Sequence, residues 1–121
     1  MSKVLYVRDK TVQKIRELKN VLLGGPKNQG DLAQMLGLSQ PQVSNYLRSE
    51  SDIFLKTGNA RATKYFLRKP LIGAEYSWPV YRITLEGHAE YFADLHSVQP
   101  NGFVSYFKKE KKWEFTDSLP W

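Results

Sequence analysis

A polar stretch near the middle of the chain carries side chains that can form paired hydrogen bonds. Gln and Asn donate and accept together, as adenine requires, and Arg can bind guanine or a phosphate. The side chains of this kind between residues 40 and 48 are Gln40, Gln42, Ser44, Asn45 and Arg48. Two cations follow at Arg61 and Lys64. These residue types suit contacts with the bases and the backbone of a nucleic acid, and their alternative is an ordinary solvated surface.

A helix is expected to position the first five of these side chains. Ser39 and Gln42 have the S-x-x-Q spacing of a capping box, which predicts a helix start at residue 40. The helix is expected to run to about residue 50. At 3.6 residues per turn, Val43, Tyr46 and Leu47 share its inner face. Ser44, Asn45 and Arg48 therefore lie on the opposite, outer face, and Gln40 and Gln42 flank that face near the start of the helix.

Two further helices are expected before this one. Over residues 9–23 the apolar side chains recur at steps of three and four: Val12, Ile15, Leu18 and Leu22. The Gly-Gly-Pro run at residues 24–26 ends that helix. Asn28 is a suitable N-cap for a second helix, which Gly37 ends.

The second and third helices have the spacing of a helix-turn-helix. Ala33, Gly37, Val43 and Tyr46 follow the pattern A-x3-G-x5-V-x2-Y. A small residue allows the helices to cross closely, and a glycine accepts the left-handed turn between them. A helical hairpin of purely structural use could copy the apolar spacing, but it would not need the glycine and the capping box as well.

A β-hairpin is expected next. Residues 53–56 and 63–67 are rich in aromatic and branched side chains, and residues 57–62 between them contain a Gly-Asn turn signal. Arg61 then lies near the tip of the hairpin and Lys64 at the start of its returning strand. Three helices followed by a hairpin predict a winged helix-turn-helix over residues 1–70.

Beyond residue 70 the apolar residues recur at every second position. Residues 81–85, 89–95, 103–107 and 113–115 are expected to form an antiparallel β meander, with turns at residues 86–87 and 108–112. The fold class is therefore α+β, with a second domain over residues 71–121. So small a meander buries little apolar surface, so it should lean on the first domain or on another chain.

Charge is concentrated in the first half of the chain. The 121 residues carry a net charge of +6. Residues 1–70 hold thirteen basic and five acidic side chains, a net +8, and residues 71–121 hold five and seven, a net −2. A basic module beside a nearly neutral one is typical of proteins that bind a polyanion such as DNA.

Several other classes are disfavoured. The chain has no cysteine, and its two histidines, His88 and His96, lack the neighbours of a metal site. No G-x-S-x-G or phosphate-binding glycine motif occurs, so we expect no catalytic residue, no cofactor and no metal. No signal-peptide pattern opens the sequence, and no apolar run reaches about 18 residues. A cytoplasmic protein without a membrane segment is expected.

Runs along most of the chain resemble a known family. The sequence GLSQ stands at residues 37–40, GNARATKY at 58–65, WPVYRI at 78–83, GHA at 87–89 and DSLPW at 117–121. In this order they resemble the amino-terminal part of HipA-like toxin kinases of the YjjJ type. The resemblance implies a winged helix-turn-helix joined to the start of a β-rich kinase subdomain, in a toxin-antitoxin context. It also implies Gln40 and Ser44 on the reading helix and Arg61 and Lys64 on the wing.

The catalytic part of that family lies beyond the resembling segment. Kinase activity therefore cannot be carried over to these 121 residues, which are either part of a longer protein or a separate component. The sequence predicts double-stranded DNA binding and transcriptional regulation, with Gln40, Gln42, Ser44, Asn45 and Arg48 in the major groove. A HipA-like kinase body, an antitoxin or a second copy are further expected partners. The alternative is a protein-interaction module that docks a kinase or an antitoxin without reading DNA.

Overall fold

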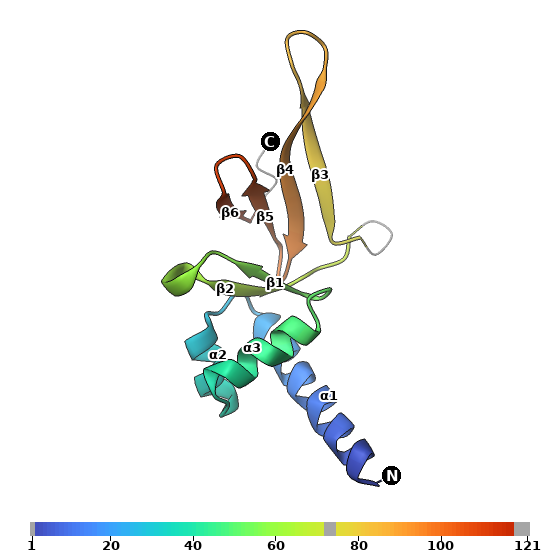
Figure 1. Ribbon diagram of the computed structural model, residues 1–121, viewed down its shortest axis with the longest axis vertical. Coiled ribbons are helices and arrows are strands. Elements are labelled where there is room, and N and C mark those ends of the chain that lie inside the picture. Colours follow the sequence, from blue (N-terminus) through green and yellow to red (C-terminus); the bar gives the residue numbers. More distant parts are fainter. Residues whose placement is uncertain (1, 72–74, 118–121) are drawn as a thin grey trace. The chain divides into compact units, whose positions relative to one another are not determined.

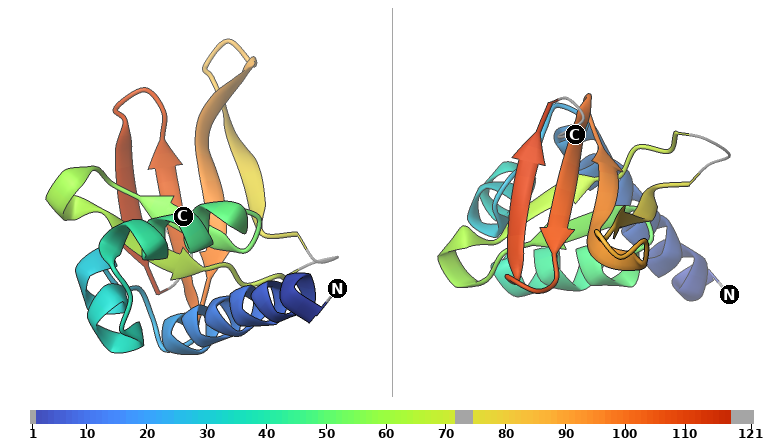
Figure 2. Two further views of the ribbon diagram at one scale, coloured as in Figure 1. Left: turned by 60° about the horizontal axis from the view of Figure 1, so that its bottom comes forward. Right: turned by 90° about the horizontal axis from the view of Figure 1, so that it is seen from above.

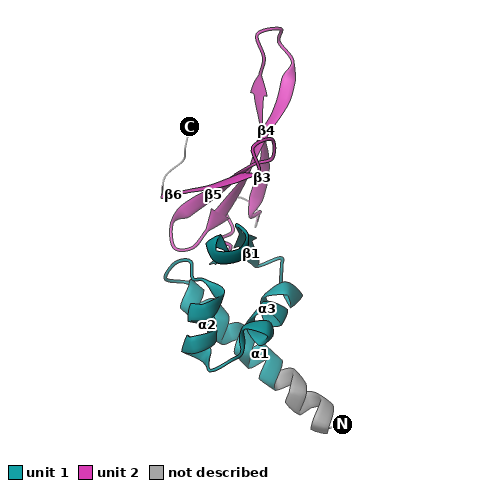
Figure 3. Ribbon diagram, turned by 60° about the vertical axis from the view of Figure 1, so that its left-hand side comes forward, with its two compact units in different colours: residues 1–67 teal, residues 68–121 magenta. Residues whose placement is uncertain are grey.

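The structure is a computed structural model that describes the backbone of residues 2–71 and 75–117, and the side chains from residue 10 onward within those ranges. The chain divides into two compact units, Met1–Leu67 and Arg68–Trp121 (Figure 3). Helices precede antiparallel strands, so the predicted α+β class is confirmed. The expected boundary at residues 69–70 falls just inside the second unit, because Lys69 N donates to Ser97 O at 3.0 Å.

The first unit has the predicted order of elements (Figure 1). It consists of α1 (Ser2–Leu22), α2 (Gln29–Leu36), α3 (Gln40–Ser49), β1 (Phe54–Thr57) and β2 (Lys64–Leu67), with a short 3₁₀ turn, η1 (Ala60–Ala62), between the strands. Helix α1 begins well before the expected residue 9. In the described part of the chain no helix has the length and apolarity needed to cross a membrane.

The predicted caps of α2 and α3 are confirmed. Asn28 Oδ1 accepts from Asp31 N at 2.7 Å, and Gly37 ends α2 with a left-handed φ of 65°. Both halves of the Ser39–Gln42 capping box form: Ser39 N donates to Gln42 Oε1 at 2.9 Å, and Gln42 N donates to Ser39 Oγ at 3.3 Å. These local bonds satisfy backbone groups that a helix end leaves unpaired, so they set where each helix begins or ends.

One apolar core joins the three helices to the hairpin. Its buried members are Leu18 and Leu22 of α1, Leu32 and Ala33 of α2, Val43 and Leu47 of α3, and Phe54, Tyr65 and Leu67 of the hairpin. The predicted apolar stripe of α1 is buried only in part, because the Val12 side chain is exposed. The core begins at Ile15, so Val12 lies one helical turn beyond it.

The hairpin is also bonded to the segment before α2. Lys27 N donates to Tyr65 O at 3.2 Å, and Tyr65 N donates to Lys27 O at 2.8 Å. The sequence analysis did not predict this bridge, which joins positions far apart in the chain. Together with the core, it holds the hairpin against the start of α2.

The second unit is the predicted meander (Figure 2). Its strands are β3 (Ser77–Ile83), β4 (Ala89–Val98), β5 (Gly102–Phe107) and β6 (Lys112–Thr116), in the sheet order β3-β4-β5-β6 with every pair antiparallel. Strand β3 starts earlier than expected. It ends at Ile83, before the expected residue 85, because the turn bonds Thr84 N to His88 O and Gly87 N to Thr84 O follow it.

A half-buried histidine lies on one face of this sheet. His96 Nδ1 faces Arg68 Nη1 at 3.1 Å, and the His96 and Trp113 rings have centroids 6.0 Å apart. Burial and, secondly, the Arg68 guanidinium lower the pKa of His96 from 6.5 to about 4, although Asp94 opposes the change. Since a guanidinium can only donate, Nδ1 accepts and the ring is neutral in the folded unit.

The low pKa of His96 makes the second unit sensitive to acid. Above pH 6.5 the ring is neutral in both the folded and the unfolded chain, so it contributes no pH dependence there. Between pH 6.5 and about 4 only the unfolded chain binds the proton, so the free energy of unfolding falls as the pH is lowered. For a half-buried group we expect a loss of about 2 kcal/mol. The three tryptophans stand at 78, 113 and 121, so urea unfolding followed by tryptophan fluorescence measures this unit.

The matched variant is His96→Gln, which keeps an acceptor for Arg68 and removes the titration. We expect its unfolding free energy to change less than that of the parent chain over the same pH range. Parallel curves for the two chains would contradict this assignment.

Candidate nucleic-acid interface

Three of the predicted site residues form one group on the outer face of α3. Arg48 Nη2 donates to Ser44 Oγ and to Asn45 Oδ1, both at 3.4 Å. Asn45 and Arg48 are exposed and Ser44 is half-buried, whereas Val43 and Leu47 are buried on the inner face. The period of the helix therefore separates an apolar inner side from a hydrogen-bonding outer side. Both bonds to Arg48 are long, so an incoming ligand can replace them at little cost.

Gln42 differs from these three residues because its side chain already has a structural role. Its Oε1 accepts the Ser39 N–H in the capping box, which leaves its Nε2 to donate outward. A paired contact with adenine needs both atoms of the amide. Gln42 can therefore donate one bond to a ligand as it stands, and it could read adenine in full only by giving up its part of the cap.

The hairpin loop turns sharply and carries Arg61 at its end. Gly58 has a φ of 75° and Ala60 a φ of 51°, and the η1 turn follows at once. Arg61 is exposed on this turn. Lys64 is exposed at the first position of β2, paired in register with Thr57. The two cations are thus on neighbouring parts of one hairpin, and of the two only Arg61 lines the cleft described next.

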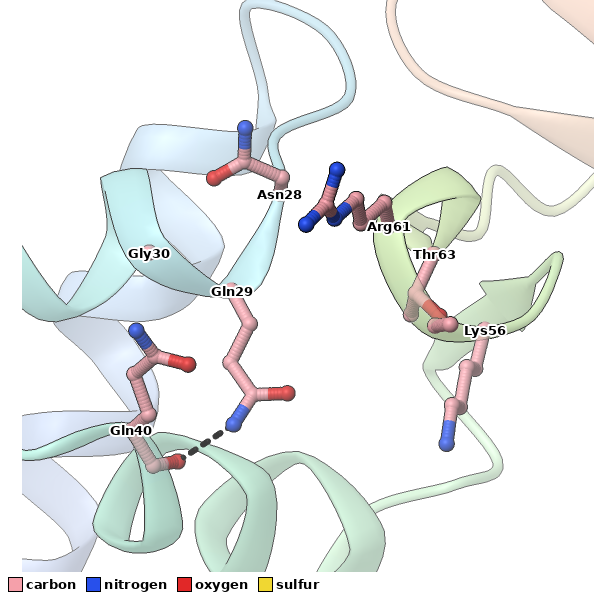
Figure 4. Close-up of a pocket in the computed structure, with 8 residues that line it drawn as sticks. Asn28, Gln29, Gly30, Gln40, Lys56, Arg61 and Thr63 are labelled. Atoms are coloured by element: carbon pink, nitrogen blue, oxygen red, sulfur yellow. Dashed lines mark hydrogen bonds between the residues drawn. The ribbon is translucent and has the colours of Figure 1, made fainter.

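A cleft of about 600 Å³ opens between this loop and the starts of α2 and α3 (Figure 4). Its lining residues are Asn28, Gln29, Gly30, Gln40, Lys56, Ala60, Arg61 and Thr63. In Figure 4 the Arg61 side chain points across the cleft toward Asn28, and Lys56 lies on the hairpin side. Six of the eight lining residues have polar side chains, and two of these side chains are cationic.

Gln29 fixes one wall of the cleft. Its Nε2 donates to Gln40 O at 2.8 Å, and its Oε1 accepts from Tyr65 Oη at 3.5 Å. It therefore links α2, α3 and β2. Gln29 and its neighbour Asn28 were not among the predicted site residues. The available signal was their place at the start of α2, the helix that precedes α3.

The surface of the first unit is cationic. Residues 1–67 carry eleven basic and five acidic side chains, a net +6. Among the side chains that the structure describes, no carboxylate lies within ion-pair distance of Arg48, Lys56, Arg61 or Lys64; the ion pairs found there are Lys14–Glu17, Arg82–Glu90 and Lys112–Glu114. These four cations are therefore available to a negatively charged ligand.

The predicted site residues do not all lie in the cleft. Gln40 and Arg61 line the cleft, whereas Ser44, Asn45 and Arg48 lie further along α3 and Lys64 lies at the start of β2. Residues 10–71 and 75–117 contain no cluster of His, Asp or Glu side chains that could hold a metal ion. The chemistry that this surface offers is hydrogen bonding and charge.

The chain has a relative among characterised proteins. It is similar to Toxin YjjJ of Escherichia coli (strain K12). The two sequences are 36% identical over 105 residues, which cover 87% of this chain and 23% of the relative. This relationship agrees with the resemblance in the sequence, although residues 118–121 of that resemblance lie outside the described part of the structure.

The similarity concerns only part of the relative, since the chain spans about a quarter of its length. No protein-family model matches the chain. No solved structure matches it either.

Proposed function

We propose that residues 1–67 are a winged helix-turn-helix that binds double-stranded DNA, with α3 as the reading helix and the β1–β2 hairpin as the wing. The observation that carries this proposal is the hydrogen-bonded group of Ser44, Asn45 and Arg48 on the outer face of α3. It is supported by the hairpin cations Lys56, Arg61 and Lys64, which have no carboxylate within ion-pair distance among the described side chains. In the relative's context, regulation of transcription within a toxin-antitoxin system is the role that fits. The chain acts in this proposal as a binding module and contributes no catalytic residue.

The outer face of α3 supplies base recognition. Asn45 can make a paired contact with adenine, and Arg48 can make one with guanine once it releases its long bonds to Ser44 and Asn45. No bulky apolar side chain stands among these three residues, so a major groove can approach them. Gln40 and the free Nε2 of Gln42 extend the same face toward the start of the helix.

The hairpin supplies orientation. Arg61 and Lys56 line the cleft beside the first turns of α2 and α3, where a backbone strand can enter between helix and wing. Phosphate contacts set the register of a protein on the duplex without reading its sequence. Lys64, outside the cleft, reaches the flanking backbone.

The test is duplex binding by the purified chain across a salt series, after selection of bound sequences from a random pool. The three cations assigned to phosphates, Lys56, Arg61 and Lys64, predict a slope of log affinity against log salt of about −3. Affinity therefore falls roughly fortyfold between about 50 and about 200 mM salt. We expect Arg48→Ala to relax the preference at one base pair by about 1–3 kcal/mol. We expect Arg61→Ala to weaken all sequences alike and to reduce the slope by about 1.

The matched control is Lys109→Ala, which removes an exposed cation from the turn between β5 and β6. It should leave both affinity and slope unchanged. Equal effects of Arg48→Ala and Arg61→Ala on every sequence would refute base reading by Arg48. Absence of binding at any salt would refute the DNA proposal and favour the alternative, a module that docks a kinase or an antitoxin.

A further inference from the structure

One end of the β3–β4 hairpin extends beyond the rest of its sheet. Strand β4 pairs with β5 only from Asp94 onward, whereas β3 and β4 stay paired out to Ile83 and Ala89. Residues 81–91 are therefore a two-stranded arm that, among the described residues, has no third strand beside it. Figure 1 shows this arm projecting past β5 and β6.

The arm has one apolar face, and that face is open. Tyr81 stands opposite Tyr91, and Ile83 stands opposite Ala89. Because side chains alternate along a strand, these two pairs share a face. The intervening pair, Arg82 and Glu90, lies on the reverse face and forms an ion pair at 3.7 Å.

The exposure of this face is unusually high for its residue types. Tyr81 is 58% exposed, Ile83 69% and Tyr91 37%. Leu85, in the turn at the tip, is 103% exposed. The two tyrosine rings pack edge to face with centroids 6.1 Å apart, which holds them in place. The arm is thus an ordered apolar surface that the rest of the described chain leaves uncovered.

Charge and area limit what can cover it. The arm carries Arg82, Glu86 and Glu90, so it offers no cationic surface to DNA or to an anionic membrane. With about 200 Å² for each large side chain, the four exposed residues offer on the order of 500 Å². Two such faces together bury on the order of 1,000 Å², about the lower limit for a specific interface between two proteins. Against a polar surface a similar area would be buried, but the apolar side chains would face polar groups that lose their hydrogen bonds to water.

We propose that the arm is a dimerisation surface that packs against the same arm of a second copy of this chain. In a dimer with a twofold axis, the same surface of both copies makes the contact. The apolar face of one arm then packs against the apolar face of the other. Face-to-face packing is favoured over addition at the β3 edge, because Pro79 interrupts the donors of that edge. The proposal does not depend on DNA binding and is tested without DNA.

The first experiment measures mass by sedimentation equilibrium over a wide concentration range. The chain of 14.0 kDa should approach twice that mass as its concentration rises. Ile83→Ser and Leu85→Ser alter side chains that have no part in the core, so folding should be retained, and each should raise the dimer dissociation constant at least about tenfold. The control Met35→Ser, at an exposed apolar position on α2, should leave the constant unchanged.

A second experiment locates the twofold axis. The chain has no cysteine, so a single cysteine introduced by Tyr81→Cys or Ala89→Cys can form a disulfide only with its own copy in the partner. We expect rapid disulfide formation under mild oxidation at one of these positions and little at Met35→Cys, because a disulfide needs Cα atoms about 4.4–6.8 Å apart. A monomer at every concentration, a dimer that Ile83→Ser and Leu85→Ser do not weaken, or equal cross-linking at Met35→Cys would each overturn the proposal.

Discussion

Replacing Leu32 by alanine is expected to destabilise the first unit by about 3–5 kcal/mol. Leu32 is fully buried in the core that joins α1, α2, α3 and the hairpin. Its truncation removes apolar contacts and leaves a cavity that four elements border. A unit of this size has a total stability of roughly 3–10 kcal/mol. The substitution therefore removes a large share of it and leaves the unit partly or wholly unfolded near room temperature.

Far-ultraviolet circular dichroism measures this effect, because every α-helix of the described chain lies before residue 50. A urea titration of Leu32→Ala should show its helical signal lost at a much lower denaturant concentration than in the parent chain. The control is Met35→Ala on the same helix, where the side chain is 56% exposed and little burial is lost. A shift for Met35→Ala as large as that for Leu32→Ala would contradict the described core.

The second large effect is expected at Gly58, in the loop that carries Arg61. The backbone there has a φ of 75°, which side chains with a Cβ rarely adopt. A Cβ at Gly58 would also collide with the backbone oxygen of Ala62. Because the obstacle is backbone, no side-chain rotation relieves it. We expect Gly58→Ala to cost about 2–4 kcal/mol locally, through left-handed strain plus the forced displacement of η1.

Trypsin offers a measurement that is independent of DNA, since it cuts after Arg61 itself. A loop that no longer holds the η1 turn should be cut at least about tenfold faster, because the opened form is more populated. If Arg61 acts as proposed, the duplex affinity of Gly58→Ala should fall about as far as that of Arg61→Ala.

The matched control is Gly37→Ala, which separates strain from collision. Gly37 also has a left-handed φ, 65°, but a Cβ there would have no heavy atom within 4 Å. It should cost only about 1–2 kcal/mol and leave cutting after Arg61 unchanged. Equal cutting of Gly58→Ala and the parent chain would mean that the loop tolerates the added methyl group, contrary to the geometry.

Much of the local structure follows from local signals. The capping box of Ser39 and Gln42, the N-cap at Asn28 and the left-handed Gly37 each act over a few residues, so the sequence is enough to predict them. The two hairpin strands and the meander follow from alternation and turn residues for the same reason. Val12 shows the limit, because periodicity marks an apolar stripe without showing how far along the helix its partner elements reach.

The candidate site depends both on the sequence pattern of α3 and on the tertiary contacts of the hairpin. Sequence period alone puts Ser44, Asn45 and Arg48 on one face of α3, as the structure has them. The cleft could not be predicted, because Gln29, Lys56 and Arg61 come together only when the hairpin is bonded to Lys27 and packed on the core. The structure also shows that Gln42 Oε1 accepts the Ser39 N–H of the cap, so only the Nε2 of this amide can donate to a ligand while the cap is kept.

By itself, the sequence determined the order of three helices, a hairpin and an antiparallel meander, together with the uneven charge, since hydrophobic period, capping residues and residue counts are local properties. Only the tertiary structure decided that Arg61 faces the start of α2 and that the apolar end of the β3–β4 hairpin stands uncovered. Both depend on which distant segments pair and where that pairing stops. Strand β5 pairs with β4 only from Asp94 onward. The alternating pattern of residues 81–91 does not predict where that pairing ends.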